Sequence, residues 1–231
     1  DIIIRGAEQI HLFDTPLLVC RNSGLSAESL IIKRAFDILL SALGCIVTSP
    51  IMLITALCIK LYDGGPVFYT QDRLTRDGKV FKVYKFRSMK TDAEKDGVAR
   101  LAGEHDDRIT PVGRVIRKVR IDELPQLLNI LKGDMSIVGP RPERPELASE
   151  NEKIMPEFRY RLKVKAGLTG YAQVLGKYNT TPYDKLRLDL MYIEQYSLLL
   201  DIKLILMTIK ILFIPESTEG VKDDNTSGTA L

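Results

Sequence analysis

The chain has 231 residues, of which 45% are hydrophobic and 27% are charged. This composition is typical of a globular chain and excludes a disordered or low-complexity one. The 33 Lys and Arg residues nearly balance the 30 Asp and Glu residues, so the formal charge of +3 gives no argument for nucleic acid. We therefore expect one principal domain with appendages and no nucleic-acid partner.

The Cys and His residues offer little chemistry. The three cysteines, Cys20, Cys45 and Cys58, are widely spaced and odd in number, so they predict neither a disulfide framework nor a CxxC metal site. The two histidines, His11 and His105, belong to no zinc-binding spacing. A reducing compartment is the natural interpretation.

Short apolar runs in residues 1–29 are broken by Pro16 and by the polar stretch 22–24, which indicates strand fragments or a linker. The sequence begins with Asp1 and shows no signal-peptide pattern nearby. We therefore expect 1–29 to be a linker, or the end of a preceding N-terminal domain, in a chain cut from something longer.

The most informative stretch runs from Ile38 to Ile59, which contains no charged residue. As a helix it would be about 33 Å long, enough to cross a hydrocarbon core of about 30 Å. Pro50 lies in its middle, where it removes a backbone donor and predicts a bend. The Ser49 hydroxyl is available for the carbonyl that the proline frees.

The charges around this run bear on its membrane placement. Lys33 and Arg34 precede the run and Lys60 follows it, which favours both ends in the cytosol. We therefore favour a re-entrant membrane hairpin over 30–64 that breaks at Ser49-Pro50. A kinked full span and a buried core helix are the alternatives.

Beyond the apolar run, the composition of 65–197 is that of a soluble domain. The stretch 80–87 alternates apolar with basic residues and predicts a half-buried strand with one cationic face. Helices are expected over 123–132, 145–162 and 182–196, and a turn over 167–170.

The C-terminal region divides into two parts. The run 198–214 is apolar but interrupted by charges, which suits an interfacial amphipathic helix, with ordinary core as the alternative. Residues 215–231 are polar and predict a flexible tail.

Two adjacent carboxylates are the strongest candidates for chemistry. Asp122 precedes the expected helix over 123–132, where an N-cap position and nearby arginines favour its ionised form. We expect Asp122 to be anionic at neutral pH and able to attack phosphorus. Glu123 offers hard oxygen ligation for Mg²⁺. A plain helix cap and a solvated first-turn residue are the alternative for this pair.

Cationic side chains near this pair could clamp phosphate oxygens. Arg117 precedes it, and Arg141 follows on a segment that two prolines hold extended. Lys85 and Arg87 on the expected strand are further candidates. Each cation could also be an ordinary surface charge.

Short blocks of the sequence stand in a recognisable order: Lys33-Arg34-Ala35-Phe36-Asp37, Ser49-Pro50, Gly65-Pro66-Val67-Phe68, Lys85-Phe86-Arg87-Ser88-Met89, Asp122-Glu123-Leu124-Pro125-Gln126, Gly133-Asp134-Met135-Ser136, Gly139-Pro140-Arg141-Pro142 and Leu168-Thr169-Gly170. Through these blocks the chain resembles the monotopic phosphoglycosyl transferases, the bacterial sugar transferase family, from about Lys33 to Ile214.

The resemblance implies that Asp122 attacks the β-phosphate of a UDP-sugar, that UMP leaves, and that polyprenyl (undecaprenyl) phosphate then takes the phosphosugar. It implies that Glu123 coordinates Mg²⁺ and that Arg117 and Arg141 hold phosphate groups. It also implies that the break at Ser49-Pro50 keeps the protein among the lipids of one leaflet, at the cytoplasmic face of the bacterial inner membrane.

The chain departs from the family pattern at Thr75, at Arg120-Ile121 and at Ala166, and none of these removes a proposed catalytic group. The segment 176–179 looks like that of long-form members. It supplies Lys177 as a further candidate for substrate binding, and similarity around Asn179 favours glucose or galactose as the sugar.

The predicted fold is α/β, mostly helical with a small sheet: a membrane-associated catalytic domain with a re-entrant helical hairpin and a C-terminal amphipathic helix. The expected reaction is the first membrane step of exopolysaccharide, capsule or O-antigen synthesis. The rival hypothesis is a non-catalytic membrane-bound scaffold or regulator that binds anionic lipids. A homodimer is left open.

Overall fold

The computed structural model describes residues 7–12, 15–20, 27–91, 93, 106–176 and 180–212, the first two ranges by their backbone alone. Its helices are α1 (Ala27–Asp63), η1 (Arg76–Gly78), α2 (Pro111–Lys118), η2 (Ile121–Glu123), α3 (Gln126–Lys132), α4 (Pro145–Ile154), η3 (Pro156–Lys163), α5 (Tyr171–Leu175), α6 (Pro182–Glu194) and α7 (Leu198–Leu212). Its strands are β1 (Ala7–Leu12), β2 (Thr15–Cys20), β3 (Phe68–Leu74), β4 (Val80–Phe86), β5 (Ser136–Val138) and β6 (Gly167–Thr169).

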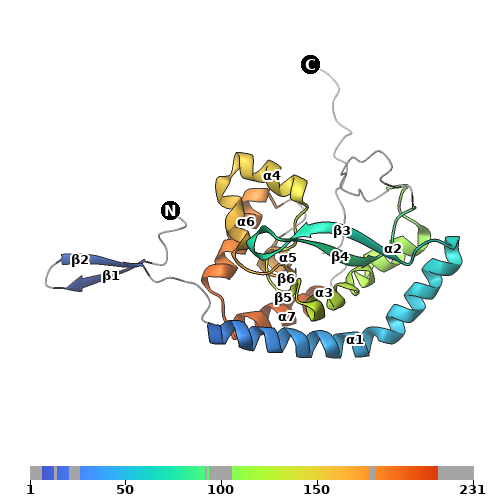
Figure 1. Cartoon of the computed structure of the whole chain (residues 1–231), viewed down its shortest axis with the longest axis horizontal. Coiled ribbons are helices and arrows are strands. Elements are labelled where there is room, and N and C mark those ends of the chain that lie inside the picture. The colour runs from blue at the N-terminus through green and yellow to red at the C-terminus, as the bar shows by residue number, and fades with distance from the viewer. Residues whose placement is uncertain are drawn as a thin grey trace, which may run out of the picture.

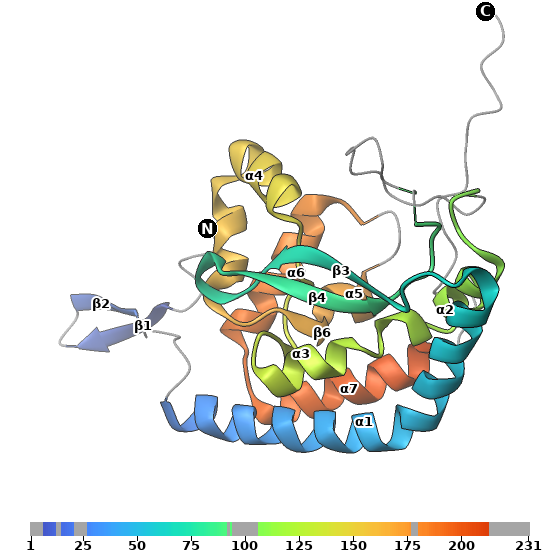
Figure 2. The ribbon, with the colours of Figure 1, turned by 45° about the vertical axis from the view of Figure 1, so that its right-hand side comes forward.

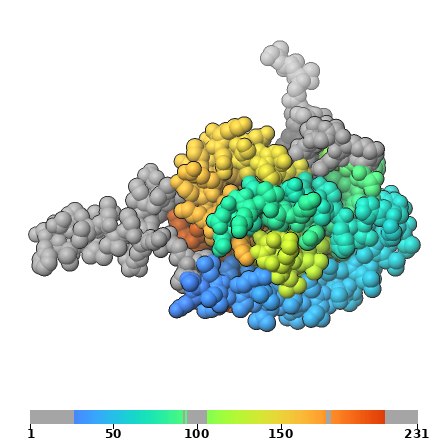
Figure 3. Space-filling model, viewed as in Figure 1, coloured from blue at the N-terminus to red at the C-terminus, as the bar shows by residue number. Residues whose placement is uncertain are grey.

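The strands of the described ranges form three two-stranded sheets, so the expectation of a mostly helical fold with little sheet is confirmed. β1 with β2 and β3 with β4 are antiparallel, whereas β5 and β6 are parallel. In Figure 1, α1 runs along the lower edge beneath α3 and α7, and α4 lies on the opposite side. The space-filling view shows α3 between α1 and the β3–β4 ribbon (Figure 3).

The main core brings together side chains from strands and helices that are distant in sequence. Its buried members are Phe81, Val83, Leu127, Ile130, Met135, Ile137, Val138, Ala166, Tyr192 and Leu204. Because β4, α3, β5, α6 and α7 each contribute, no single segment can bury its apolar face alone.

Several predicted elements are confirmed, and others are not. β4 occupies the predicted strand and α6 the predicted helix over 182–196. The helix over 145–162 is interrupted at Met155, because Pro156 disfavours helical backbone in the residue before it. The turn over 167–170 is wrong, since this stretch is β6, whose pairing with β5 is a long-range contact.

The prediction that one face of β4 is cationic is also wrong. Lys82 is exposed, but Lys85 and Arg87 lie on the opposite face with the buried side chains of Phe81 and Val83. These two cations are therefore turned toward the domain and can contact its other segments.

Helix α1 bends within its apolar run, as Figure 2 shows. Pro50 lies inside the helix and cannot donate to the carbonyl four residues before it, which belongs to Ile46. The Ser49 hydroxyl donates to this Ile46 carbonyl at 2.8 Å. The predicted bend and its hydroxyl partner are confirmed. α1 is one bent helix of 37 residues rather than a tight hairpin, and its re-entrant placement stays a prediction.

The two faces of α1 are reversed relative to a helix on the surface of a soluble protein. The buried stripe includes the polar residues Asp37, Ser41 and Thr55. The outward face is apolar: its large exposed side chains include Ile31, Leu39, Leu43, Ile46, Leu53, Ile54, Leu57 and Leu61. In the described part of the chain, α1 is the one helix long and apolar enough to cross a membrane. Such a patch indicates an apolar environment.

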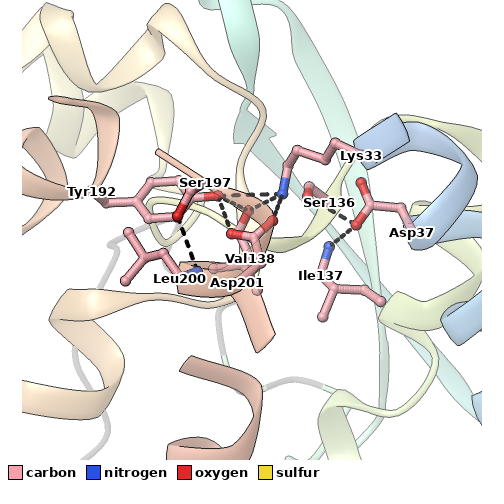
Figure 4. Close-up of polar contacts among 9 residues, drawn as sticks. All are labelled: Lys33, Asp37, Ser136, Ile137, Val138, Tyr192, Ser197, Leu200 and Asp201. Atoms are coloured by element: carbon pink, nitrogen blue, oxygen red, sulfur yellow. Dashed lines mark hydrogen bonds and ion pairs between the residues drawn. The ribbon is translucent and has the colours of Figure 1, made fainter. Parts of the chain in front are cut away.

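A buried ion pair fastens α1 to the domain (Figure 4). Lys33 Nζ lies 2.7 Å from Asp201 Oδ2 on α7, and it donates to the Val138 carbonyl at 3.1 Å. The side chains of Lys33 and Asp201 are only 11% and 1% exposed. The Tyr192 hydroxyl completes the cluster by donating to Asp201 Oδ1 at 2.8 Å. This polar cluster therefore connects four elements: α1, β5, α6 and α7.

The neighbouring residues of α1 add further polar contacts. Arg34 donates to the carbonyls of Ile130 and Leu131 at 2.6 and 2.7 Å, at the end of α3. Asp37 Oδ1 accepts from the Ser136 hydroxyl and from the Ile137 amide (Figure 4). The charges that the sequence suggested as topology signals thus also bind the helix to the domain.

Helix α7 combines both alternatives weighed for it. Leu204 is fully buried in the core, whereas Leu199 and Leu206 on the other side are 80% and 61% exposed. The inner face is ordinary core. The outer face carries apolar side chains together with the exposed Lys203 and Lys210. Helix α7 runs beside α1 (Figures 1 and 2), and its placement at a membrane interface stays a prediction.

Replacement of Asp201 should strongly destabilise the fold. In Asp201→Ala, Lys33 keeps a buried charge without a counter-charge, so we expect a loss of about 3–5 kcal/mol in the free energy of unfolding. Thermal unfolding in detergent micelles measures it, with Lys203→Ala on the exposed side of α7 as control. The double variant Lys33→Met with Asp201→Leu should recover most of the loss. Equal melting temperatures for Asp201→Ala and Lys203→Ala would contradict this view of the pair.

Candidate active site

The two carboxylates lie in a tight turn between α2 and α3. Arg120 has left-handed backbone angles (φ 55°, ψ 22°), which end α2 and begin the short turn η2. Helix α3 then starts only after Pro125, whose φ of −61° suits the entry to a helix. Asp122 therefore lies inside η2 and does not cap α3, so the N-cap prediction is wrong and the helix-dipole argument no longer applies to it.

Glu123 binds two cations with one oxygen. Its Oε1 accepts from Lys85 Nζ and from Arg141 Nη2, both at 2.8 Å, and its side chain is only 14% exposed. Burial alone would raise the pKa of Glu123, but Arg141 and Lys85 outweigh it and hold this pKa well below its usual range. Glu123 is thus a permanent anion that joins β4, η2 and the segment after β5.

Asp122 lies in a different balance of charges. Burial raises its pKa, and the neighbouring Glu123 charge raises it further, while Lys85, Arg117 and Arg141 act in the opposite direction. The net result is a raised pKa. The nearby arginines lower the pKa of Asp122, as expected, but burial and the anionic Glu123 outweigh them, so the net shift is opposite to the expected one.

Four of the predicted residues are thus gathered around Asp122: Glu123, Lys85, Arg117 and Arg141. We call these five residues the carboxylate cluster. Arg117 is half-buried on α2, close enough for its charge to lower the pKa of Asp122. Three cations against two carboxylates leave the cluster able to attract a diphosphate.

Asn129 on α3 keeps β4 in place behind this cluster. It is fully buried, its side-chain amide donates to the Lys82 carbonyl at 2.8 Å, and its oxygen accepts from the Tyr84 amide at 2.9 Å. Lys85 follows directly on the same strand and can therefore reach Glu123. The sequence signal for Asn129 is a polar side chain within the apolar run of a helix.

Arg87 does not join the carboxylate cluster. It is 6% exposed, its guanidinium pairs with both oxygens of Asp63 at the end of α1, and its Nε donates to the Pro66 carbonyl at 2.7 Å. With its donors bound in this way, Arg87 ties α1 to β4, and its assignment to phosphate binding is corrected. Lys177 and Asn179 lie outside the described residues.

The cluster can contribute to a magnesium site but cannot form a complete one. The described residues contain no group of three or more His, Cys, Asp or Glu side chains that could hold a metal ion. Mg²⁺ is usually held by one or two carboxylates together with substrate phosphates and water. Two adjacent carboxylates, one kept anionic by its cations, fit that requirement.

Comparison with known proteins shows which family this chain matches. Residues 28–215 match the model of the bacterial sugar transferase family. The chain belongs to this family. The match includes α1, the carboxylate cluster and α7, so the resemblance seen in short blocks is confirmed over most of the chain.

Three relatives illustrate the range of the family. A UDP-N-acetylgalactosamine-undecaprenyl-phosphate N-acetylgalactosaminephosphotransferase of Aeromonas hydrophila is 44% identical over 182 residues, which cover 78% of this chain and 43% of the relative. A UDP-glucose:undecaprenyl-phosphate glucose-1-phosphate transferase of Escherichia coli is 39% identical, with coverage of 89% and 44%. The exopolysaccharide production protein PSS of Rhizobium leguminosarum is 39% identical, with coverage of 83% and 98%.

This member of the bacterial sugar transferase family therefore spans less than half the length of the first two relatives and nearly all of the third.

The charge balance around Asp122 can be tested without any substrate. In Glu123→Gln the anionic neighbour is gone, so the pKa of Asp122 should fall, whereas in Lys85→Met it should rise. Titration of carboxyl-labelled Asp by ¹³C NMR measures both shifts, with the exposed Glu146→Gln as control. An Asp122 titration that is the same in all three variants would contradict the coupling.

Proposed function

We propose that this protein transfers a sugar-1-phosphate from a UDP-sugar to undecaprenyl phosphate through a covalent intermediate on Asp122. The observation that carries the proposal is the placement of Asp122 among Lys85, Arg117 and Arg141, with Glu123 beside it. This arrangement offers a nucleophile and a set of phosphate ligands within one small cluster.

In the first step, a carboxylate oxygen of Asp122 attacks the β-phosphorus of the UDP-sugar. The bond from this phosphorus to the oxygen that bridges it to the α-phosphate breaks, and UMP leaves with the electron pair. Arg117 and Arg141 hold phosphate oxygens and offset the charge that develops. Because burial and Glu123 raise the pKa of Asp122, its carboxylate is more basic than that of a free Asp.

In the second step, a phosphate oxygen of undecaprenyl phosphate attacks the same phosphorus. The acyl–phosphate bond to Asp122 breaks, the carboxylate is regenerated, and the product is a polyprenyl diphosphate sugar. The cations of the cluster serve both steps, since each step passes a phosphoryl group between two anions. Glu123, with phosphate oxygens and water, would hold Mg²⁺, which neutralises diphosphate charge when bound.

The lipid acceptor requires that the cluster lie at a membrane, and α1 supports this part of the proposal. As a straight helix, its 37 residues would measure about 55 Å, far more than a bilayer core of about 30 Å. Both ends of α1 bind the same domain, through Lys33 at one end and Asp63 at the other. A helix with both ends on one domain favours a re-entrant placement over a simple span.

We therefore propose that α1 enters one leaflet from the cytoplasmic face of the inner membrane and returns at the bend by Ser49-Pro50. The exposed apolar side chains of α1 and of α7 would both face lipid. UDP-sugar from the cytosol and the lipid acceptor could then meet at the carboxylate cluster.

For the sugar, we propose UDP-glucose or UDP-galactose. The Escherichia coli relative is named for glucose and one from Salmonella typhimurium for galactose, while the Aeromonas hydrophila relative is named for N-acetylgalactosamine. A panel of these three UDP-sugars distinguishes the possibilities, and preference for the acetamido sugar would overturn this choice.

The covalent mechanism is tested by incubating the purified protein with radiolabelled UDP-sugar and Mg²⁺. We expect release of UMP and a protein-bound phosphosugar, and Asp122→Asn should reduce both by about 10⁴-fold or more, because it removes the nucleophile. The exposed Asp107→Asn is the matched control.

Three other results of this incubation would have distinct meanings. A scaffold that only binds lipid would release no UMP under any condition. An enzyme that works by direct displacement would release UMP only when undecaprenyl phosphate is present, and it would form no adduct. Formation of the adduct by the Asp122→Asn variant would show that another residue is the nucleophile.

Membrane placement is tested by cysteine labelling. Single cysteines are placed at two exposed positions, Glu28 in the first turn of α1 and Lys79 after α1, in a background where Cys20, Cys45 and Cys58 are replaced by Ser. A membrane-impermeant maleimide should label both from the cytosolic side alone, because a re-entrant helix has both ends there. Labelling of the two positions from opposite sides would establish a full span.

A further inference from the structure

The segment that presents Arg141 begins buried at Gly139 and Pro140 and becomes exposed at Arg141. We call residues 139–144 the Arg141 loop. The Arg141 side chain is 48% exposed and reaches Glu123 at 2.8 Å. A half-exposed guanidinium is held at its tip only, so the position of its backbone decides whether it can reach the cluster.

The backbone of the Arg141 loop is held by one hydrogen bond per residue. Four successive carbonyls accept: Pro140 from the Gly167 amide at 2.8 Å, Arg141 from Arg161 Nη2 at 3.0 Å, Pro142 from Arg73 Nη1 at 3.3 Å, and Glu143 from the Leu74 amide at 2.9 Å. The donors come from η3, β3 and β6, all outside the loop. The carbonyl of Arg141 itself thus depends on the side chain of Arg161.

Arg161 is itself fixed from several sides. It is 6% exposed, and its Nη2 lies 2.7 Å from Asp189 Oδ2 on α6, while Nη1 lies 3.3 Å from Glu143 Oε2. Its guanidinium also covers the ring of Phe158 at 4.7 Å. Asp189 is only 1% exposed, so this is a buried ion pair. Such pairs contribute little net stability, and a role in fixing one geometry is the better explanation.

We infer that Arg161 is a positioning residue for the proposed reaction: it holds the Arg141 carbonyl and thereby sets the reach of the Arg141 guanidinium toward phosphate. The inference rests on the proposed function of the carboxylate cluster. A guanidinium is needed because it offers several donors in a fixed plane to Asp189, Glu143 and the carbonyl at once. A lysine ammonium on a flexible stem can keep the charge and the Asp189 pair but cannot hold all three partners.

Arg161→Lys is the decisive variant, because it keeps the buried charge. We expect kcat/KM for the UDP-sugar to fall about 10- to 100-fold, as for a misplacement of a substrate ligand by about 1 Å. The exposed Arg159→Lys, two residues earlier in η3, is the matched control and should leave kcat/KM unchanged.

A double-mutant cycle separates positioning from a general loss of structure. If Arg161 acts through Arg141, then Arg161→Lys should have almost no further effect in an Arg141→Ala background. Additive losses in kcat/KM would overturn the inference, and so would an Arg161→Lys enzyme within twofold of wild type.

Hydrogen exchange gives a readout that does not depend on activity. In Arg161→Lys the amides of Gly167 and Leu74, which donate to the Pro140 and Glu143 carbonyls of the loop, should exchange faster, while those of α3 and α6 stay protected. Unchanged exchange at these two amides would overturn the inference. If the wild type releases no UMP, the proposed function fails, whereas the exchange result still decides whether Arg161 positions the loop.

A second variant covers the case in which Arg161→Lys does not fold. Glu143→Gln removes the charge that Arg161 Nη1 contacts and leaves the Arg161–Asp189 pair intact. Because the Glu143 side chain is 29% exposed, this change is mild for the fold. It should speed exchange of the Gly167 and Leu74 amides and lower kcat/KM, each by a smaller factor than Arg161→Lys does, and no change in either would count against the inference.

Discussion

A polar stripe on an otherwise apolar helix is the constraint on which the rest of this structure depends. Helix α1 presents an apolar face outward because Lys33, Asp37, Ser41 and Thr55 are turned to the inner side. Lys33 pairs with Asp201 at 2.7 Å, and Asp37 accepts from the Ile137 amide. Exposed charges of this kind would oppose contact with lipid, whereas buried and paired ones do not. The same contacts therefore stabilise the domain and leave a surface suited to a membrane.

The carboxylate cluster is built outward from this frame. Helix α3 packs on α1, Asn129 of α3 holds β4, and Lys85 of β4 reaches Glu123. From the other side, Arg161 fixes the loop that carries Arg141. A shift of α1 relative to α3 would thus reach the carboxylate cluster through these hydrogen-bonded neighbours. Rigid support from buried elements is the usual requirement for placing reactive groups.

Much of the fold could be predicted where a local rule applies. Alternating residues predicted β4, and Pro50 with Ser49 predicted the bend of α1 and the bond to the Ile46 carbonyl. Predictions failed where a distant partner decides the outcome. The stretch 167–170 becomes a strand because β5 lies beside it, and Arg87 is engaged because Asp63 ends α1 next to it. Neither partner can be deduced from the residues adjacent in sequence.

By itself, the sequence determined which residue types are available: a charge-free apolar run with a central proline, a pair of adjacent carboxylates, and blocks that belong to the bacterial sugar transferase family. The tertiary structure decided what those residues do. It turned Asp122 from an expected helix cap into a buried group with a raised pKa, and it gave Arg161 a partner twenty positions away. The reason is physical: pKa values, ion pairs and hydrogen bonds depend on distance and burial, which only the packed chain defines.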